Sequence, residues 1–481
     1  KSSEHYLYTM MRYLFLTLLS AAFIGQFFID SGVKRILFDD SNPGSIIECT
    51  IIEVVGQSQR NEEVDKYNYT GNNNKDTFLA CISDPDDFVR TISGPNLEKH
   101  NSTLVRGARV RFADVLVTMS KIIFSEGSKI EIVKQEPDSS SRLASISSSS
   151  SRRGRRLQSL EIETTGTRRI LVIRVTTSDG AVSYDSATIS DKVFGTNGNT
   201  NTPTALYQDC SFGQLDFQPS TADGAVNGVI EVTVDLPTPK SSNNVSNFDI
   251  MNEAWLQLPG TVSYPDHHLL FALPKSTVNY KYFGFYSALR SIFNDEYITS
   301  PIAVAQALAL NFGVHRSLSS SYEPFGDLSD YMSLQDYETD LNAYHKMCFN
   351  AVKNYQFGWY SARSIDVDIT TQSWTGTLVA TADYDQAAAG EYVLIKLGFF
   401  YIQYNKKKGI IAEIQEHGDT IAAYVYSEPI SISAFQLNNA GTDAIASGDT
   451  IEICSMSTTP AGVDFAVVSI HNFANGQVSL C

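Results

Sequence analysis

The chain has 481 residues, more than one hydrophobic core usually serves, and this length predicts two to four domains. Its 53 acidic side chains against 36 basic ones give a formal charge of −17, which repels phosphate backbones and argues against nucleic acid as a partner. Six cysteines without a Cys-x-x-Cys pair are too few for a disulfide scaffold and offer no zinc knuckle.

The N-terminal segment has the layout of a secretory signal. Within residues 1–30, the stretch MMRYLFLTLLSAAFIGQFF has one arginine followed by an apolar run that ends in small residues. An uncleaved membrane anchor is the alternative, because the run approaches the roughly 18 residues that span a bilayer. We therefore expect a secreted, extracellular protein, or else a membrane-anchored one. Secretion would make the sequons at Asn68, Asn101 and Asn244 candidate glycosylation sites.

Residues 31–136 are predicted to form a β-rich, propeptide-like region. The segments 49–55, 104–119 and 129–135 alternate apolar and polar side chains, which is typical of strands. Residues 137–160 are rich in serine and arginine and predict a disordered linker. Its arginine cluster includes Arg155 and Arg156, which fit either processing by a furin-like convertase or a solvated charge run.

The segment 161–363 predicts an α+β domain. Buried strands are expected at 168–180, 228–236 and 267–274, and helices at 287–295 and 300–313. From residue 364 to 481 the pattern changes to short alternating strands separated by turns, which predicts an all-β, sandwich-like module.

The helix expected at 300–313 has clear boundary signals. Ser300 suits the N-cap, Pro301 suits the first turn, and Gly313 suits a left-handed end. Gln306 and Leu310 stand one turn apart on this helix, at the spacing with which HExxH peptidases place two histidines on one zinc ion.

Several blocks extend this comparison along the chain. They are CSFGQLDF (210–217), ALPKST (272–277), LALNFGVHRS (308–317), FGDLSDYMS (325–333) and KMCFNAVKNYQFGWYSAR (346–363). In this order they resemble the gametolysin family of secreted zinc metallopeptidases, over about residues 168–481. The resemblance implies a metzincin-like peptidase domain followed by the β module, with Met332 in the Met-turn, and an association with glycoprotein cell-wall or matrix material.

The positions that the resemblance assigns to zinc chemistry are substituted. The first ligand falls on Gln306, the general base on Ala307, the second ligand on Leu310 and the third on Arg316. Alanine cannot take a proton from zinc-bound water, and leucine has no electron pair for a metal. We therefore expect no catalytic residue, no metal ligand and no cofactor, with zinc only if the family activity is retained.

These substitutions lead to one functional expectation and two alternatives. The chain is expected to be a pseudopeptidase that binds extracellular or cell-wall glycoproteins. The first alternative is an active zinc endopeptidase that uses a non-standard metal site with His315 and His345. The second is a structural component of the wall.

Other candidate groups favour structural interpretations. His267 and His268 lead into a buried strand, although a metal or acid–base pair remains an alternative. The carboxylate pairs Asp383/Asp385 and Asp366/Asp368 are expected to be solvated, and the aromatic clusters at 279–286 and 355–360 to belong to the core. Sorting the cysteines by domain suggests the pairs Cys49–Cys81, Cys210–Cys348 and Cys454–Cys481, although sequence does not fix connectivity.

Overall fold

The structure is a computed structural model. It describes residues 47–57, 77–83, 89–93, 109–117, 121–134, 163–240, 242–262, 267–277, 280–285, 289–319, 325–368, 373–427, 430–436, 441–446, 449–472 and 481. In the strands before residue 135 and across 427–449 it describes the backbone, together with the burial of Ile92, Val110 and Ile130.

The first described part of the chain consists of strands, as expected. They are β1 (Ile47–Gln57), β2 (Thr77–Ser83), β3 (Val89–Ser93), β4 (Arg109–Val117) and β5 (Lys121–Lys134). They pair in the order β2-β3-β5-β4-β1, and the end of β1 also pairs antiparallel with β11.

A mixed α/β arrangement follows. Its strands are β6 (Gly166–Thr177), β7 (Gly180–Ala181), β8 (Leu215–Pro219), β9 (Val229–Thr233), β10 (His267–Leu273), β11 (Tyr282–Phe285) and β12 (Arg290–Asn294). Its helices are α2 (Ser186–Phe194), α3 (Pro203–Cys210), α4 (Asn247–Leu256), η3 (Asp295–Thr299) and α5 (Pro301–Asn311). Strands β8, β9, β10 and β12 join β6 in a parallel block, and β11 pairs antiparallel with β12.

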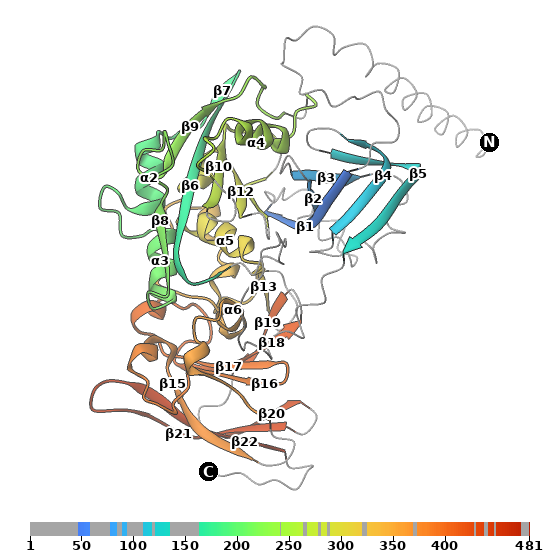
Figure 1. Ribbon diagram of the computed structural model, residues 1–481. Helices are drawn as coiled ribbons and strands as arrows, with labels where there is room; N and C mark the ends of the chain where they lie inside the picture. Colours follow the sequence, from blue (N-terminus) through green and yellow to red (C-terminus); the bar gives the residue numbers. More distant parts are fainter. Residues whose placement is uncertain are drawn as a thin grey trace, which may run out of the picture. The chain divides into compact units, whose positions relative to one another are not determined.

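Strand β6 sorts the helices onto two faces of this sheet (Figure 1). Ile170 and Val172 point into a core shared with α2, α3 and α5, whereas Leu171 and Ile173 point into a core shared with α4. The alternation follows from the two-residue repeat of a strand, and burial on both faces explains the continuous apolar run in the sequence.

One expected helix is a strand. The segment predicted as a helix at 287–295 contains β12 (Arg290–Asn294), whose five residues are all buried between β10 and β11. A short apolar run does not distinguish a buried helix from a buried strand by its period, and here the neighbouring strands decide.

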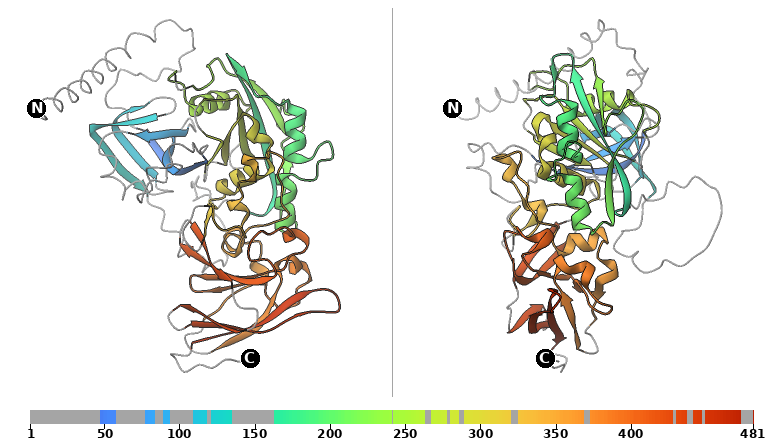
Figure 2. Two further views of the ribbon diagram at one scale, coloured as in Figure 1. Left: turned by 180° about the vertical axis from the view of Figure 1, so that it is seen from behind. Right: turned by 90° about the vertical axis from the view of Figure 1, so that its left-hand side faces the viewer.

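The C-terminal part contains two sheets that share one core (Figure 2). One has the order β13-β19-β18-β17-β16-β14 and the other β15-β22-β21-β20. Ile402 and Ala423 of the first sheet meet Val468 and Ile470 of the second in that core, as in a sandwich. The first sheet is not confined to residues 364–481, because β13 comes from earlier in the chain.

The elements of this part are short. The helical segments are η4 (Tyr331–Ser333), η5 (Asp336–Glu338), α6 (Ala351–Phe357), η6 (Ser361–Arg363), η7 (Thr381–Gln386) and η8 (Gly409–Ile411). The strands are β13 (Ser317–Leu318), β14 (Ser364–Asp366), β15 (Trp374–Val379), β16 (Leu394–Leu397), β17 (Phe400–Asn405), β18 (Thr420–Ser427), β19 (Ile430–Gln436), β20 (Gly441–Ala446), β21 (Asp449–Thr458) and β22 (Asp464–Asn472).

Two disulfides agree with the pairing by domain. Cys210 at the end of α3 bonds to Cys348 just before α6, and Cys454 bonds to Cys481. The side chains of Cys49 and Cys81 lie outside the described ones, so their expected pairing stays a prediction.

Candidate functional site

Helix α5 (Pro301–Asn311) is the element that the sequence singles out. It begins as expected, because the Ser300 side chain accepts a hydrogen bond from the Ala303 N–H, and it ends before Gly313, which has φ 80°. All eleven residues of α5 are buried. A helix that is apolar on every side belongs to a core rather than to a cleft surface.

Gln306 lies in the middle of this helix and its side-chain amide is fully engaged. The Tyr282 hydroxyl donates to Gln306 Oε1 at 2.7 Å. Gln306 Nε2 donates to the carbonyls of Tyr331 and Leu334, each at 2.9 Å. The amide therefore ties α5 to strand β11 on one side and to the turn that contains η4 on the other.

Ala307 and Leu310 are packed rather than open. Ala307 is fully buried and Leu310 is 4% exposed. A Cβ added to Gly284 of β11 would lie 2.6 Å from Leu310 Cβ and 3.0 Å from the Ala307 carbonyl oxygen. The strand therefore contacts the helix at these two positions so closely that only glycine fits opposite them.

The basic residues after the helix are also engaged. The Arg316 guanidinium lies 4.9 Å from the centre of the Phe325 ring, within the range of a cation–π contact. His315 is 5% exposed. The position assigned to a third zinc ligand thus holds a cation placed against an aromatic ring.

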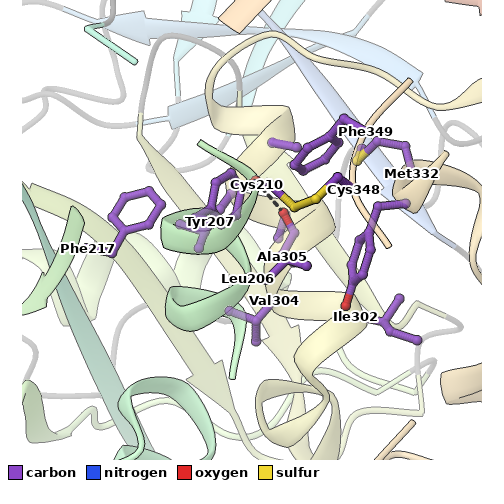
Figure 3. Close-up of a cluster of buried hydrophobic side chains, with 14 of the residues drawn as sticks. Leu206, Tyr207, Cys210, Phe217, Ile302, Val304, Ala305, Met332, Cys348 and Phe349 are labelled. Atoms are coloured by element: carbon purple, nitrogen blue, oxygen red, sulfur yellow. Dashed lines mark hydrogen bonds between the residues drawn. A yellow bond between two sulfur atoms is a disulfide. The ribbon is translucent and has the colours of Figure 1, made fainter. Parts of the chain in front are cut away.

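Met332 lies in the short helical segment η4, whose start is capped by the Asp330 side chain bonded to the Met332 N–H. Its side chain is buried in the same core as α5, α3 and the Cys210–Cys348 disulfide. Figure 3 shows this cluster, in which the Tyr207 hydroxyl donates to the Ala305 carbonyl at 2.8 Å. Met332 thus packs into the core that surrounds α5, and its assignment to a Met-turn stays a prediction.

A zinc ion does not fit these residues. The one oxygen donor, Gln306 Oε1, already accepts from Tyr282, and the neighbouring positions are an alanine and a leucine. A catalytic zinc site needs three nitrogen, sulfur or oxygen ligands and a water. Within the described residues, no group of three or more His, Cys, Asp or Glu side chains is placed to hold a metal ion.

The other histidines lie in different surroundings. His268 of β10 is buried between the rings of Phe217 and Phe312, and burial lowers its pKa to about 3, so it is neutral at physiological pH. His345 is partly exposed, with Nε2 at 2.6 Å from Asp336 Oδ2. His267 is 7% exposed at the start of the same strand as His268, which fits a structural role.

One of the carboxylates expected to be solvated is buried. Asp383 is 1% exposed and pairs with Lys408 at 2.6 Å, because the turn that carries it is the helical segment η7 packed against the β module. That expectation was wrong for Asp383. Asp385, Asp366 and Asp368 are exposed, as expected.

The aromatic clusters are core, as expected. Phe357 and Trp359 stack with ring centres 4.1 Å apart, and both are buried. Tyr280, Tyr282 and Phe285 are buried as well.

A buried polar cluster around Lys353 was not predicted from the sequence. This lysine of α6 is 1% exposed and pairs with Asp330, which is fully buried, at 2.8 Å. The available signal was a lysine inside the apolar block KMCFNAVKNYQFGW, since a lysine is almost never fully buried unless it is paired.

Several expected sites lie outside the described residues. These are the signal segment, Asn68, Asn101, Arg155 and Arg156. Asn244 is described and exposed, in the loop before α4. Its sequon serine, Ser246, is the N-cap of that helix and donates to Asp249 Oδ2 at 2.7 Å.

Comparisons with known proteins add no relative. No family model, no curated protein and no solved structure matches the chain. Among the described residues, no helix is long and apolar enough to cross a membrane.

Proposed function

We propose that the chain is a secreted pseudopeptidase of the gametolysin type, which acts by binding extracellular or cell-wall glycoproteins and not by cleaving them. The family assignment rests on the ordered sequence blocks. It is supported by their placement, since the blocks at 210–217, 325–333 and 346–363 surround helix α5 in one core.

The main support for catalytic inactivity is the hydrogen bonding of the Gln306 side chain. Zinc is bound in proteins by Cys, His, Asp or Glu side chains, whereas this position holds an amide that three protein hydrogen bonds fix across the core. The adjacent Ala307 offers no base, and Gly284 packs directly onto Leu310. Without metal ligands and a general base, the chain can neither activate a zinc-bound water nor take its proton.

A peptidase fold that lacks its catalytic side chains can still bind proteins or glycoproteins. Loss of a few catalytic side chains leaves the folded surface in place, and function resides in sites carried by a fold. The expected secretion and the sequon at the exposed Asn244 favour an extracellular partner.

The experiment compares digestion with binding. The purified secreted chain is incubated with casein or gelatin and, separately, with an immobilised cell-wall glycoprotein fraction. We expect saturable binding and no digestion. Digestion that a chelator stops would instead identify an active zinc endopeptidase, and His315→Ala and His345→Ala variants would then locate its metal.

A triple variant, Ala307→Glu, Leu310→His and Arg316→His, tests the same proposal by restoring the residues of a zinc site. If the scaffold is a peptidase fold that has lost its chemistry, this variant should bind zinc where the natural chain does not. If the natural chain neither binds the cell-wall glycoprotein fraction nor digests casein or gelatin, a structural component of the wall is the remaining function.

A further inference from the structure

A cluster of polar side chains around Asp330, the residue before η4, is buried in the interior. Asp330 Oδ2 lies 2.8 Å from Lys353 Nζ, and Lys353 Nζ donates to the Ser317 hydroxyl at 2.5 Å. The Ser317 hydroxyl in turn donates to Asp330 Oδ2. Each of these side chains is at most 1% exposed.

A second carboxyl group adjoins this ion pair. Asp327 is fully buried and accepts from the Ser329 N–H at 3.1 Å and from Asn350 Nδ2 at 2.9 Å. Asn350 Nδ2 also donates to the Ser317 hydroxyl at 3.2 Å, which links Asp327 to the ion pair. Two buried carboxyl groups thus lie near one ammonium group, which pairs directly with Asp330 alone among the described carboxylates.

Among the described residues, the other charged and titratable groups around Asp327 supply no second positive charge. Asp330 comes from the same turn and Lys353 from α6, while Tyr424 comes from β18. On the rim, the Glu416 carboxylate accepts from the Leu328 N–H at 3.3 Å and adds a further negative charge. Ionising both buried carboxyls leaves one uncompensated charge in the interior, which is costly.

The cluster spans two parts of the molecule. The Ser329 hydroxyl lies 2.9 Å from the Tyr424 hydroxyl, to which Asn405 Nδ2 of β17 also donates at 2.9 Å. From α6, Asn354 Nδ2 donates to Gln403 Oε1 of β17 at 3.1 Å. Hydrogen bonds therefore run from the Asp327–Asp330 turn and α6 into the six-stranded sheet.

We propose that the Asp327–Asp330–Lys353 cluster is a pH-responsive lock that holds α6 and the 327–330 turn to strands β17 and β18. The lock is closed when Asp327 carries a proton and the cluster is neutral. It loosens when both carboxyl groups are ionised.

The direction of the titration agrees with this geometry. Burial, followed by the charge of Asp330, raises the pKa of Asp327 to about 7 from an ordinary value near 3.8. Between these two pH values the folded chain holds a proton that the unfolded chain has lost. The stabilisation is therefore fully present below about pH 4, and it is lost as the pH rises to about 7, with the unfolding constant increasing about tenfold per pH unit.

The test compares the natural chain with Asp327→Asn, which resembles the protonated acid at every pH. Urea unfolding is measured from pH 5 to pH 8.5. The ratio of the unfolding constant of the natural chain to that of Asp327→Asn should rise about tenfold per pH unit up to about pH 7 and then level off. The matched control is Asp366→Asn, which removes an exposed carboxylate paired with Lys396 and should show no such slope.

Hydrogen exchange places the effect in the structure. After correction for intrinsic exchange chemistry, protection of the amides at 351–357 and 420–427 should fall between pH 5 and pH 8 in the natural chain, relative to β10. A ratio of unfolding constants that is constant with pH would overturn the proposal. If Asp327→Asn does not fold, unchanged relative protection in the natural chain would overturn it as well.

Discussion

Gln306, which the sequence resemblance assigns to a ligand position, serves the fold in this structure. Its amide supplies an acceptor to Tyr282 and two donors to backbone carbonyls, all inside the core. Buried polar groups must be paired, and an amide meets these three needs at once where a histidine has only two ring nitrogens. The residue therefore connects α5 to the turn at Met332 without a metal.

Replacing Gln306 tests this role. Gln306→Ala removes three buried hydrogen bonds and leaves the Tyr331 and Leu334 carbonyls without this donor, so we expect a loss of about 2–5 kcal/mol in the free energy of unfolding. Urea denaturation at neutral pH measures it. The matched control is Gln208→Ala on the exposed side of α3, which should change the same quantity by less than about 0.5 kcal/mol. Equal effects of the two substitutions would refute the structural role.

At the scale of elements, the contact between β11 and α5 depends on Gly284. The strand approaches the helix at Ala307 and Leu310 so closely that an added methyl group would overlap Leu310 Cβ. This packing leaves no room for a larger side chain on the strand side of Ala307 and Leu310.

Gly284→Ala is the direct test of that packing. The new methyl group should push the strand from the helix and lower the free energy of unfolding by about 1–3 kcal/mol. Gly260→Ala is the control, because a Cβ at Gly260 meets nothing within 4 Å. If thermal or urea unfolding shows no difference between Gly284→Ala and Gly260→Ala, the close packing is not real.

Some helices and strands were predicted from the sequence more accurately than others. Helix α5 was predicted within two residues at each end, because Ser300, Pro301 and Gly313 each act through local backbone chemistry. Strands β6 and β10 were recognised from long apolar runs. Strand β12 was mistaken for a helix, because its state is decided by the neighbouring strands β10 and β11 and not by its own five residues.

The candidate site could likewise be predicted only in part. The spacing along one helix places Gln306, Ala307 and Leu310 together, so their chemistry could be judged from sequence. The hydrogen bonds of Gln306 join positions up to 28 residues away, and the cluster of Ser317, Asp330 and Lys353 joins separate loops and helices. No local period encodes such contacts, which arise only when the chain is packed.

At the scale of the whole molecule, the two disulfides constrain the chain unequally. Cys210–Cys348 closes a loop with a separation of 138 residues, and Cys454–Cys481 one of 27 residues. A longer loop loses more entropy in the unfolded chain when it is closed.

Removing each pair should therefore have unequal costs. We expect the double variant Cys210→Ala/Cys348→Ala to lose about 1–2 kcal/mol more unfolding free energy than Cys454→Ala/Cys481→Ala. Urea denaturation of both variants beside the natural chain measures the difference. An equal or larger cost for the Cys454–Cys481 pair would show that strain or local packing outweighs loop length.

Helix α5 and its neighbours are expected to hold no zinc ion. The most direct test is the metal content of the purified secreted chain, measured by mass spectrometry after equilibration with zinc and removal of the free ion. We predict far less than one zinc ion per chain, with the same value for Gln306→Ala. About one zinc ion per chain that Gln306→Ala, His315→Ala or His345→Ala abolishes would contradict the account.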